Sequence, residues 1–295
     1  MPETEKLRFT GGHRACAGCG LPMSVQQVLA ATKEPVIVVA ATGCLEICTT
    51  AFPETSWQTP FLHSLFENTA AVASGVEAAL RAFQGKKRLR RRPKVVAFAG
   101  DGGTYDIGLQ ALSGAVERGH DFVFVCLDNE GYMNTGYQRS SASPLHATTT
   151  TTPVGKATPQ KNILKILAAH NIPYAAQTTV AHFKDLKRKA EKALARSGPA
   201  FLNIFAPCPT NWKSPPALSL KICRQAVETN FWSLLEFEQG QWKLNFEPKE
   251  RAPISTFLAT QKRFAKVLRD PKSLADLQKS IDEDFAELKR SASTS

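Results

Sequence analysis

Long hydrophobic runs are absent from this sequence of 295 residues. No stretch comes near the ~20 consecutive apolar residues that a membrane-spanning helix requires, and the first residues lack the pattern of a signal peptide. These absences predict a cytoplasmic protein without a membrane span. In that reducing setting, the seven cysteines are more often metal or redox groups than structural disulfides.

Acidic residues are in deficit. The 37 lysines and arginines against 26 aspartates and glutamates give a formal net charge of +11. The segment 86–94 (KKRLRRRPK) supplies much of this excess and contains no aromatic residue. Without aromatic side chains to stack on bases, it does not predict nucleic-acid binding. We expect either a solvated loop or a docking site for an acidic partner protein.

Two apolar runs, KVVAFA (94–99) and DFVFVCL (121–127), predict buried parallel strands because they are rich in β-branched and aromatic residues. Apolar residues at helical spacing over 104–118 predict a helix between them, which makes the unit a βαβ crossover. A GDG motif (100–102) follows the first run, and DNEG (128–131) follows the second. Ligands bind at the carboxyl ends of strands in such sheets, so Asp101 and Asn129 are expected at one site.

The spacing of these motifs resembles the thiamine diphosphate signature, in which GDG precedes an asparagine by roughly two and a half dozen residues. The resemblance implies a magnesium ion bound by Asp101, Asn129 and the backbone carbonyl of Gly131. Magnesium prefers such hard oxygen ligands and takes the rest from phosphate and water. Two ordinary strand-end turns are the structural alternative. The glycines expected beside the diphosphate are Gly100, Gly102 and Gly103.

A C-x-x-C pair, Cys16 and Cys19, precedes a helix that is predicted to begin near Pro22. The small residues between the two cysteines allow both thiolates to face one centre. On this pair alone, zinc, a redox dithiol and an iron-sulfur cluster are all compatible with the sequence.

Longer motifs give a more specific resemblance that covers almost the whole chain. They are GHRACAGCG (12–20), ATGCLEIC (41–48), HSLFENTAAVASGVEAAL (63–80), AGDGGTYDIGLQALSGAVERGH (99–120), DNEGYMNTGYQRSS (128–141) and APCPTNW (206–212). With them the sequence closely resembles the β subunit of the multi-subunit pyruvate:ferredoxin oxidoreductases, within the 2-oxoacid:ferredoxin oxidoreductases. The resemblance implies thiamine diphosphate, Mg²⁺ and one [4Fe-4S] cluster, with Cys16, Cys19, Cys44 and Cys208 as the cluster ligands.

The other cysteines have different expected roles. Cys126 lies inside a predicted strand and Cys223 on a predicted helix, so both are expected to pack in the core. Cys48 stands four residues after Cys44. It would compete as a cluster ligand if the predicted loop carrying Cys44 were helical.

Three polar residues are candidates for the cofactor pocket. Asn134 is expected to face the substrate and the reactive thiazolium as a catalytic residue, the alternative being a side chain that stabilises its own turn. Glu67 and His63, in or before a helix predicted over 64–83, are expected to line the pocket, although His63 fits a boundary position equally well. Glu46 is either an electrostatic neighbour of the cofactor or a surface charge.

The resemblance also implies a reaction: pyruvate and CoA are converted to acetyl-CoA and CO2, and electrons pass through the cluster to ferredoxin, reversibly. Thiamine enzymes need a glutamate on the aminopyrimidine ring, which in this family belongs to another subunit. We therefore expect the chain to be inactive alone. Its expected partners are an α subunit that supplies the pyrimidine-binding domain and this glutamate, and ferredoxin-like and γ-type subunits.

Three alternatives remain open. Related enzymes act on oxalate, branched-chain 2-oxo acids or 2-oxoglutarate. A zinc-stabilised binding module, with a structural C-x-x-C pair and a basic segment that contacts nucleic acid, is a more distant alternative. A cluster-free thiamine decarboxylase or synthase is disfavoured by the four cysteines.

The alternation of predicted strands and helices indicates a doubly wound α/β fold with a mainly parallel sheet of the thiamine diphosphate-binding type over residues 1–213. Between its elements, the long segment 130–159 is expected to be functional. Residues 214–295 are predicted to form a C-terminal extension of a helix, a hairpin turning at 239–240 and two amphipathic helices. We expect this extension to pack on a partner subunit.

Overall fold

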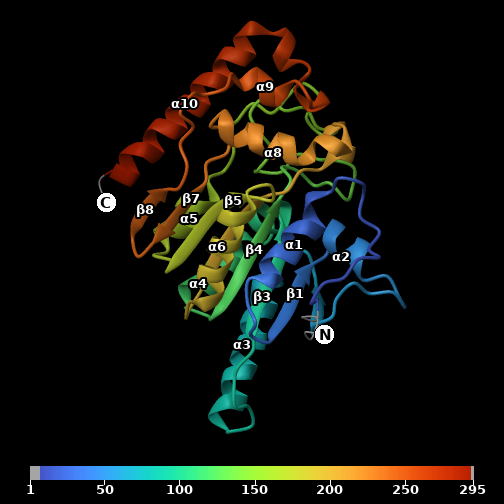
Figure 1. The fold of residues 1–295 in the computed structure, drawn as a ribbon, viewed down its shortest axis with the longest axis vertical. Helices are drawn as coiled ribbons and strands as arrows, with labels where there is room; N and C mark the ends of the chain where they lie inside the picture. The colour runs from blue at the N-terminus through green and yellow to red at the C-terminus, as the bar shows by residue number, and fades with distance from the viewer. Residues whose placement is uncertain (1–6, 294–295) are drawn as a thin grey trace, which may run out of the picture.

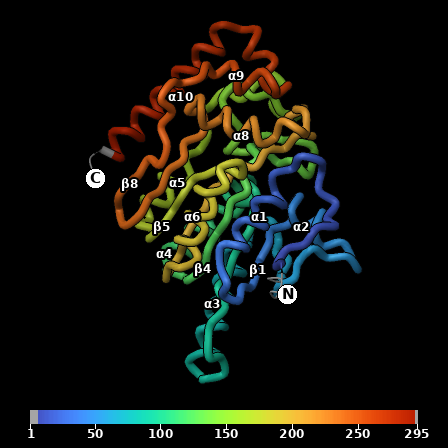
Figure 2. Tube along the Cα trace, viewed as in Figure 1, coloured from blue at the N-terminus to red at the C-terminus, as the bar shows by residue number. Residues whose placement is uncertain are grey.

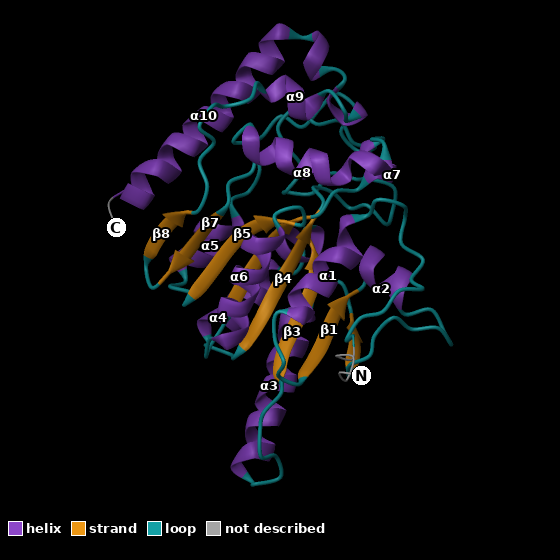
Figure 3. Cartoon of the chain, viewed as in Figure 1, coloured by secondary structure: helices purple, strands orange, loops and turns teal. Residues whose placement is uncertain are grey.

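The computed structural model describes residues 7–293. Its centre is an eight-stranded sheet in the order β2-β1-β3-β4-β6-β5-β7-β8, drawn in orange in Figure 3. The strands from β2 to β5 in this order are parallel, and β7 and β8 add an antiparallel edge. The predicted α/β fold is thus confirmed. The strands are β1 (Val36–Ala41), β2 (Phe61–Ser64), β3 (Lys94–Gly100), β4 (Phe122–Asp128), β5 (Tyr174–Thr179), β6 (Ala200–Phe205), β7 (Leu235–Glu238) and β8 (Gln241–Leu244).

Helices cover both faces of the sheet, as Figure 1 shows. Alternate residues of β4 enter opposite cores: Val123 and Val125 pack with α1 and α6, and Phe122 and Phe124 with α3, α4 and α5. Because successive strand residues point to opposite faces, a strand covered on both sides must be apolar throughout. The helices are α1 (Gly20–Ala30), α2 (Cys44–Thr49), α3 (Thr69–Gly85), α4 (Leu109–Glu117), α5 (Ile163–Ala169), α6 (Phe183–Ala195), α7 (Pro209–Trp212), α8 (Ser219–Glu228), α9 (Ile254–Leu258) and α10 (Pro271–Ser293).

Two local predictions near the site were wrong. The helix expected from residue 64 begins at Thr69, because residues 61–64 form β2 and pair in register with β1 at the sheet edge. His63 therefore lies on a strand rather than before a helix. The loop expected around Cys44 is the short helix α2. Six residues give too little periodicity to reveal a helix in the sequence.

The C-terminal part of the chain adds to the same sheet and core. The predicted hairpin forms β7 and β8, and β7 pairs with β5. Beyond it, Phe257, Phe264 and Leu277 belong to the core that also contains β4 and α1. Figure 2 traces this red segment over the carboxyl ends of the strands. The division at residue 213 and packing of residues 214–295 on a partner subunit stay predictions.

The basic segment 86–94 follows α3, which projects away from the body of the molecule in Figure 1. Its second half is anchored by ion pairs: Arg92 contacts Glu77 and Asp121 at 3.0 and 2.6 Å, and Lys94 contacts Asp121 at 2.5 Å. Its first half, 86–90, is largely exposed. The solvated-loop prediction therefore holds for the first half of the segment only. Within the described residues, no helix is both long and apolar enough to cross a membrane.

A buried carboxylate fastens the antiparallel edge to α6. Glu236 on β7 is 1% exposed, and it accepts hydrogen bonds from Tyr174 (2.8 Å), Arg188 (2.6 Å), Lys192 (2.9 Å) and Asn245 (2.7 Å). Burial alone would raise the pKa of Glu236, but these bonds outweigh it and hold the pKa at about 2. The charged form is therefore the one that the fold stabilises.

We expect Glu236→Gln to lower the free energy of unfolding at pH 7 by about 2 to 3 kcal/mol, because the depressed pKa stabilises the fold. This stabilisation is complete above the ordinary pKa near 4.5 and is lost as the pH falls towards 2. The variant should consequently lose less stability than the wild type between pH 5 and pH 3. Urea titrations across that range test this, with the more exposed Glu238→Gln as control. If the variant and the wild type lost the same stability between pH 5 and pH 3, Glu236 would not be the group that stabilises the fold in this range.

Candidate functional site

A cavity of about 240 Å³ lies where β1, β3 and β4 end. Both predicted motifs reach it, together with the start of α2 and the segment after β4. Its lining is largely apolar, as is usual for cofactor pockets. The lining includes Leu21, Thr42, Gly43, Cys44, Phe66, Phe98, Gly100, Asp101, Gly102, Leu127, Asn129, Gly131, Tyr132, Met133 and Asn134.

Asp101 directly follows β3 and is 1% exposed. Ser140 donates a hydrogen bond to its Oδ2 at 2.5 Å. Burial raises the pKa of Asp101 to about 7, against the lowering effect of the bonds that it accepts. A carboxylate this deeply buried beside a cavity is costly unless a cation or a proton compensates it.

Asn129 and Gly131 meet Asp101 across the cavity floor. One terminal atom of the Asn129 amide lies 2.9 Å from Asp101 Oδ1 and 3.0 Å from the carbonyl oxygen of Gly131. As nitrogen this atom donates to both oxygens, and as oxygen it completes a group of three oxygen ligands. The three predicted magnesium ligands thus converge, and their donor set fits a hard divalent cation.

Glycine is required at two positions of these motifs. A Cβ on Gly102 would lie 2.2 Å from Cε1 of Tyr132, and one on Gly131 would lie 2.8 Å from the ring of Tyr137. The Tyr132 ring therefore packs directly on the backbone of the GDG motif, and the Tyr137 ring packs on the backbone of DNEG. The segment 102–106 winds into a single π-helical turn before α4, where the sequence predicted a regular helix, and such turns are common at functional sites.

The C-x-x-C pair sits in a turn beside the segment that carries Cys208. The amide of Cys19 donates to the carbonyl of Cys16 at 3.0 Å, and the amide of Gly20 donates to Pro207 at 3.1 Å. Gly18 has φ +72°, and a Cβ there would lie 2.5 Å from the carbonyl oxygen of Pro216. Glycine is therefore needed at position 18 for the pair to pack against the segment that carries Pro216.

Five thiols gather at this place. Burial raises the pKa of Cys19 to about 12, with further contributions from Cys208, Cys48 and Cys44. Burial likewise raises the pKa of Cys44 to about 12, with contributions from Cys208, Cys48 and Cys16. Neighbouring thiols that are costly to ionise fit a centre whose positive charge stabilises thiolates. In residues 7–293, no three histidine, cysteine or acidic side chains have the spacing of a single-ion site.

The remaining cysteines divide as the sequence suggested. Cys126 on β4 and Cys223 on α8 are both fully buried, which confirms their packing roles. Cys48 lies one turn after Cys44 on α2, so the helical condition for its competition as a ligand is met. The choice between Cys44 and Cys48 stays a prediction.

Asn134 is exposed at the cavity, and Cys44 Sγ lies 3.9 Å from its Oδ1. His63 Nε2 lies 2.7 Å from Thr42 Oγ1 and 3.6 Å from Glu46, outside the cavity lining. Glu67 also lies outside the lining, although its neighbour Phe66 belongs to it. Roles of these residues toward a cofactor stay predictions.

Sequence reasoning missed the apolar wall of the cavity, formed by the side chains of Phe66, Tyr132 and Met133. The HSLFEN and DNEGYMN motifs contain these residues, but only the polar positions suggested chemistry. An edge-to-face contact joins Phe66 and Tyr132, with ring centroids 5.9 Å apart. These apolar residues could therefore have been suspected because they stand next to the polar motif residues, but no sequence pattern assigned them to the cavity.

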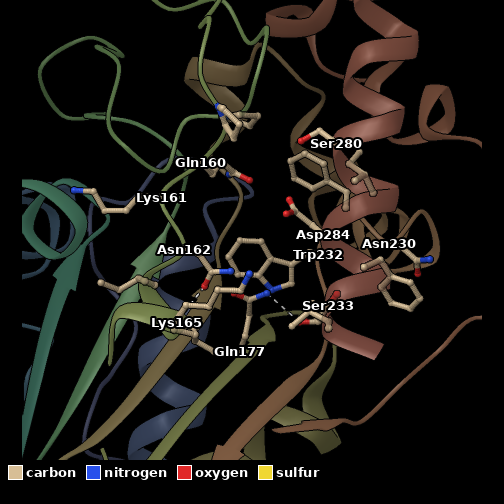
Figure 4. A pocket seen from close by; sticks show the side chains of 18 of the residues that line it. Gln160, Lys161, Asn162, Lys165, Gln177, Asn230, Trp232, Ser233, Ser280 and Asp284 are labelled. Atoms are coloured by element: carbon tan, nitrogen blue, oxygen red, sulfur yellow. Dashed lines mark hydrogen bonds between the residues drawn. The ribbon is translucent and has the colours of Figure 1, made fainter. Parts of the chain in front are cut away.

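A second cavity, of about 190 Å³, lies between α10 and the sheet. Figure 4 shows Ser280 and Asp284 of α10 facing Trp232 across it, with Gln177 below, where its amide donates to Ser233 O at 3.1 Å. None of the predicted site residues lines this cavity.

Comparisons with known proteins agree with this geometry. A family model described as thiamine pyrophosphate enzyme, C-terminal TPP binding domain, matches residues 41–204. The pyruvate synthase subunit PorB of Methanothermobacter marburgensis is 46% identical over 294 residues, covering 98% of this chain and 99% of the relative. The PorB of Thermotoga maritima is 44% identical (95% and 90% covered). The ketoisovalerate oxidoreductase subunit VorB of Pyrococcus furiosus is also 44% identical (99% and 98% covered).

A solved 2-oxoglutarate:ferredoxin oxidoreductase from Magnetococcus marinus shares the fold. Its TM-score is 0.58 at 22% identity, with 73% of this chain and 79% of that chain covered. The match to the domain model includes both motifs that line the cavity, and the PorB relatives align over nearly their full length. The chain belongs to the thiamine pyrophosphate enzymes and, among them, to the family of oxidoreductase subunits that contains pyruvate synthase PorB.

Proposed function

We propose that this chain is the β subunit of a pyruvate:ferredoxin oxidoreductase that works reversibly as a pyruvate synthase in the cytoplasm. It would hold thiamine diphosphate with Mg²⁺ in the cavity and a [4Fe-4S] cluster on Cys16, Cys19, Cys44 and Cys208. The single observation that carries this proposal is the position of Cys44. It lines the cavity and is at the same time an electrostatic neighbour of the other cysteines. Cys44 would therefore lie between the cofactor and the cluster.

The cavity floor supports the magnesium assignment. Asp101, Asn129 and the carbonyl of Gly131 would hold the ion, because one terminal atom of the Asn129 amide already lies about 3 Å from both Asp101 Oδ1 and the Gly131 oxygen. Thiamine diphosphate, when bound, supplies the carbanion chemistry by which a 2-oxo acid loses CO2. This chain's residues would orient the diphosphate, and the apolar wall of Phe66, Tyr132 and Met133 would keep water from the reactive end of the cofactor.

Asn134 is the proposed catalytic residue because of its place between the two sites. Its amide is exposed to the cavity, and its Oδ1 faces Cys44 Sγ. A polar group here would orient the substrate carboxylate or carbonyl by hydrogen bonding. Its contact with Cys44 would also tune the electronic environment of that cluster ligand.

The chain needs a partner for catalysis. The activating glutamate of thiamine enzymes is expected on the pyrimidine-binding domain of an α subunit, and the ferredoxin-like and γ-type subunits complete the proposed assembly. Exposed apolar side chains support docking of a partner beside the cavity: Ile47 is 51% exposed, Phe52 96% and Leu65 62%. They lie on α2, after α2 and after β2, respectively. Such apolar exposure is typical of protein interfaces.

The identity of the substrate is the most specific part of the proposal. PorB relatives are named for pyruvate and VorB relatives for ketoisovalerate, at closely similar identities to this chain. Pyruvate is favoured by the number of PorB relatives and by motifs that resemble the pyruvate enzymes. Oxalate, 2-oxoglutarate and branched-chain 2-oxo acids are the competing substrates, and much of the pocket that selects among them is expected on the α subunit.

The assembled complex provides the test. We expect pyruvate and CoA to drive viologen reduction with a kcat/KM at least ~10-fold higher than that for 2-ketoisovalerate, because extra methyl groups are excluded from a pocket built for the smaller acid. The isolated chain should be inactive. Iron and sulfide analysis of the isolated chain should show that it is a brown cluster protein by itself. A colourless protein with one zinc, or turnover by the isolated chain, would overturn the proposal.

A further inference from the structure

A buried ion pair stands directly behind the predicted magnesium site. Glu130 lies between Asn129 and Gly131 in sequence, and its side chain points away from the cavity. Its Oε2 is 2.5 Å from Nη2 of Arg263, and both side chains are at most 1% exposed. Arg263 belongs to the C-terminal segment between α9 and α10. The metal-binding turn is thus joined to a part of the chain far away in sequence.

The same arginine supports the turn through a second contact. Its guanidinium carbon lies 3.8 Å from the ring centroid of Trp212, which is fully buried. Trp212 Nε1 in turn donates to the carbonyl oxygen of Asn129 at 3.0 Å. Trp212 ends α7, the short helix directly after Cys208. Arg263 therefore contacts the predicted metal turn through one residue and the predicted cluster turn through another.

The conformation of the turn explains why such support is needed. Glu130 has φ +65°, in the left-handed region that side chains other than glycine seldom adopt. Its amide donates to Asp128 Oδ1 at 3.0 Å, its carbonyl accepts from Ser143 at 2.9 Å, and Gln160 donates to its Oε1 at 3.0 Å. Hydrogen bonds thereby fix the backbone of Glu130 and one of its carboxylate oxygens, and the other carboxylate oxygen faces Arg263. The backbone on either side of it carries Asn129 and the Gly131 carbonyl toward the cavity.

A buried charge pair adds little net stability, because apolar residues of equal volume usually stabilise a core as well or better. It does restrict geometry, since a buried charge pair combined with planar stacking on an aromatic ring admits few arrangements. Trp212 and Phe264 belong to a large apolar core, where Arg263 Nε also donates to Oε1 of the buried Gln261 at 2.9 Å. The pair is thus better explained by the turn that it orients than by the core that it occupies.

We propose that Arg263 is a positioning residue for the metal site. Acting through Glu130 and Trp212, it holds the Asn129–Gly131 turn in its ligating geometry and in register with the Cys208 turn. This inference rests on the proposed magnesium and thiamine diphosphate site. Outer residues that orient metal ligands typically affect metal affinity by 10- to 100-fold when they are replaced.

The test measures Mg²⁺ affinity in the assembled complex, by calorimetric titration of Mg²⁺ at a fixed concentration of thiamine diphosphate. We expect Arg263→Met to weaken the apparent Mg²⁺ affinity at least tenfold. Glu130→Gln combined with Arg263→Met removes both charges, so it should recover melting temperature but not affinity. Trp212→Phe keeps an aromatic ring, although a smaller one, and removes the N–H donor, so it should also weaken Mg²⁺ binding. The matched control is Arg251→Met, which breaks the more exposed Arg251–Asp282 pair between the residues before α9 and α10.

The outcomes separate the two proposals. Loss of affinity in the double variant with a recovered melting temperature supports the positioning role. Mg²⁺ affinity within twofold of wild type in both the double variant and Trp212→Phe would overturn it, and would leave Arg263 as a packing residue. If Arg263→Met does not fold, these two variants decide the question. A wild-type complex that binds no thiamine diphosphate would overturn the proposed function itself, and this inference with it.

Discussion

Cys208→Ser is expected to abolish electron transfer to viologen or ferredoxin, with turnover at least ~100-fold below that of the wild type, while thiamine diphosphate binding stays within about threefold. A serine oxygen is a poor ligand for the soft iron-sulfur centre, so the cluster loses one of its four attachments. Cys208 lies in the turn between β6 and α7 and does not line the cofactor cavity. The two sites should therefore fail separately. Iron and sulfide analysis, viologen reduction and calorimetry with Mg²⁺-thiamine diphosphate measure the three expectations.

Cys48→Ser is the matched control, because Cys48 is a half-buried thiol in the same group. We expect it to keep full cluster content and turnover. The opposite pattern, in which Cys48→Ser loses the cluster and Cys44→Ser retains it, would move the third ligand one helical turn along α2. Unchanged turnover in Cys208→Ser would refute the assignment of that residue as a ligand.

The sequence predicted those parts of the fold in which the local pattern and the tertiary environment agree. β3 and β4 are covered on both faces, so each of their residues had to be apolar, and the two runs were recognisable without any partner. Asp101 and Asn129 were predicted for the same reason. They stand where such runs end, and a doubly wound topology brings those ends together.

The missed parts depend on contacts that no local pattern records. β2 has four residues at the edge of the sheet, and only its register with β1 defines it as a strand. Arg263 sits in a segment predicted simply as part of an extension, where one arginine among many basic residues carries no signal. Its proposed positioning role can be recognised only from the folded structure, in which it lies on Trp212 and beside Glu130. Supporting residues of this kind can be recognised only from the folded topology, whereas ligand residues can be recognised from their chemical type and motif.

Three carboxylates are buried around the metal turn: Asp101, Asp128 and Glu130. Burial raises the pKa of each. Glu130 is compensated by Arg263 at 2.5 Å, and Asp128 accepts a hydrogen bond from Tyr105 at 2.7 Å. Asp101 accepts from Ser140 but has no cationic partner among the ion pairs of the described residues. Among the same ion pairs Asp128 likewise has no cationic partner, and of these two carboxylates only Asp101 lines the cavity.

Asp101→Asn should therefore weaken Mg²⁺-dependent thiamine diphosphate binding by about 100-fold or more and abolish turnover, because a neutral amide is a much poorer ligand for a hard cation. The same change should raise the stability of the cofactor-free protein by about 1 to 3 kcal/mol, since it removes a buried carboxylate that no cation balances. The new amide keeps an acceptor for Ser140. A gain in stability with a loss of function is characteristic of a site built for a ligand.

Melting temperatures with and without Mg²⁺-thiamine diphosphate measure both effects at once. A ligand that binds only the folded state stabilises it by about 2.7 kcal/mol at 100 times its Kd, so the wild-type complex should show a clear upward shift and Asp101→Asn should show none. Asp121→Asn is the matched control, because Asp121 pairs with Arg92 and Lys94 at the opposite end of the sheet. It should lose stability and keep the cofactor-induced shift. If Asp101→Asn behaved like this control, the carboxylate would be structural, and the metal site would have to lie elsewhere.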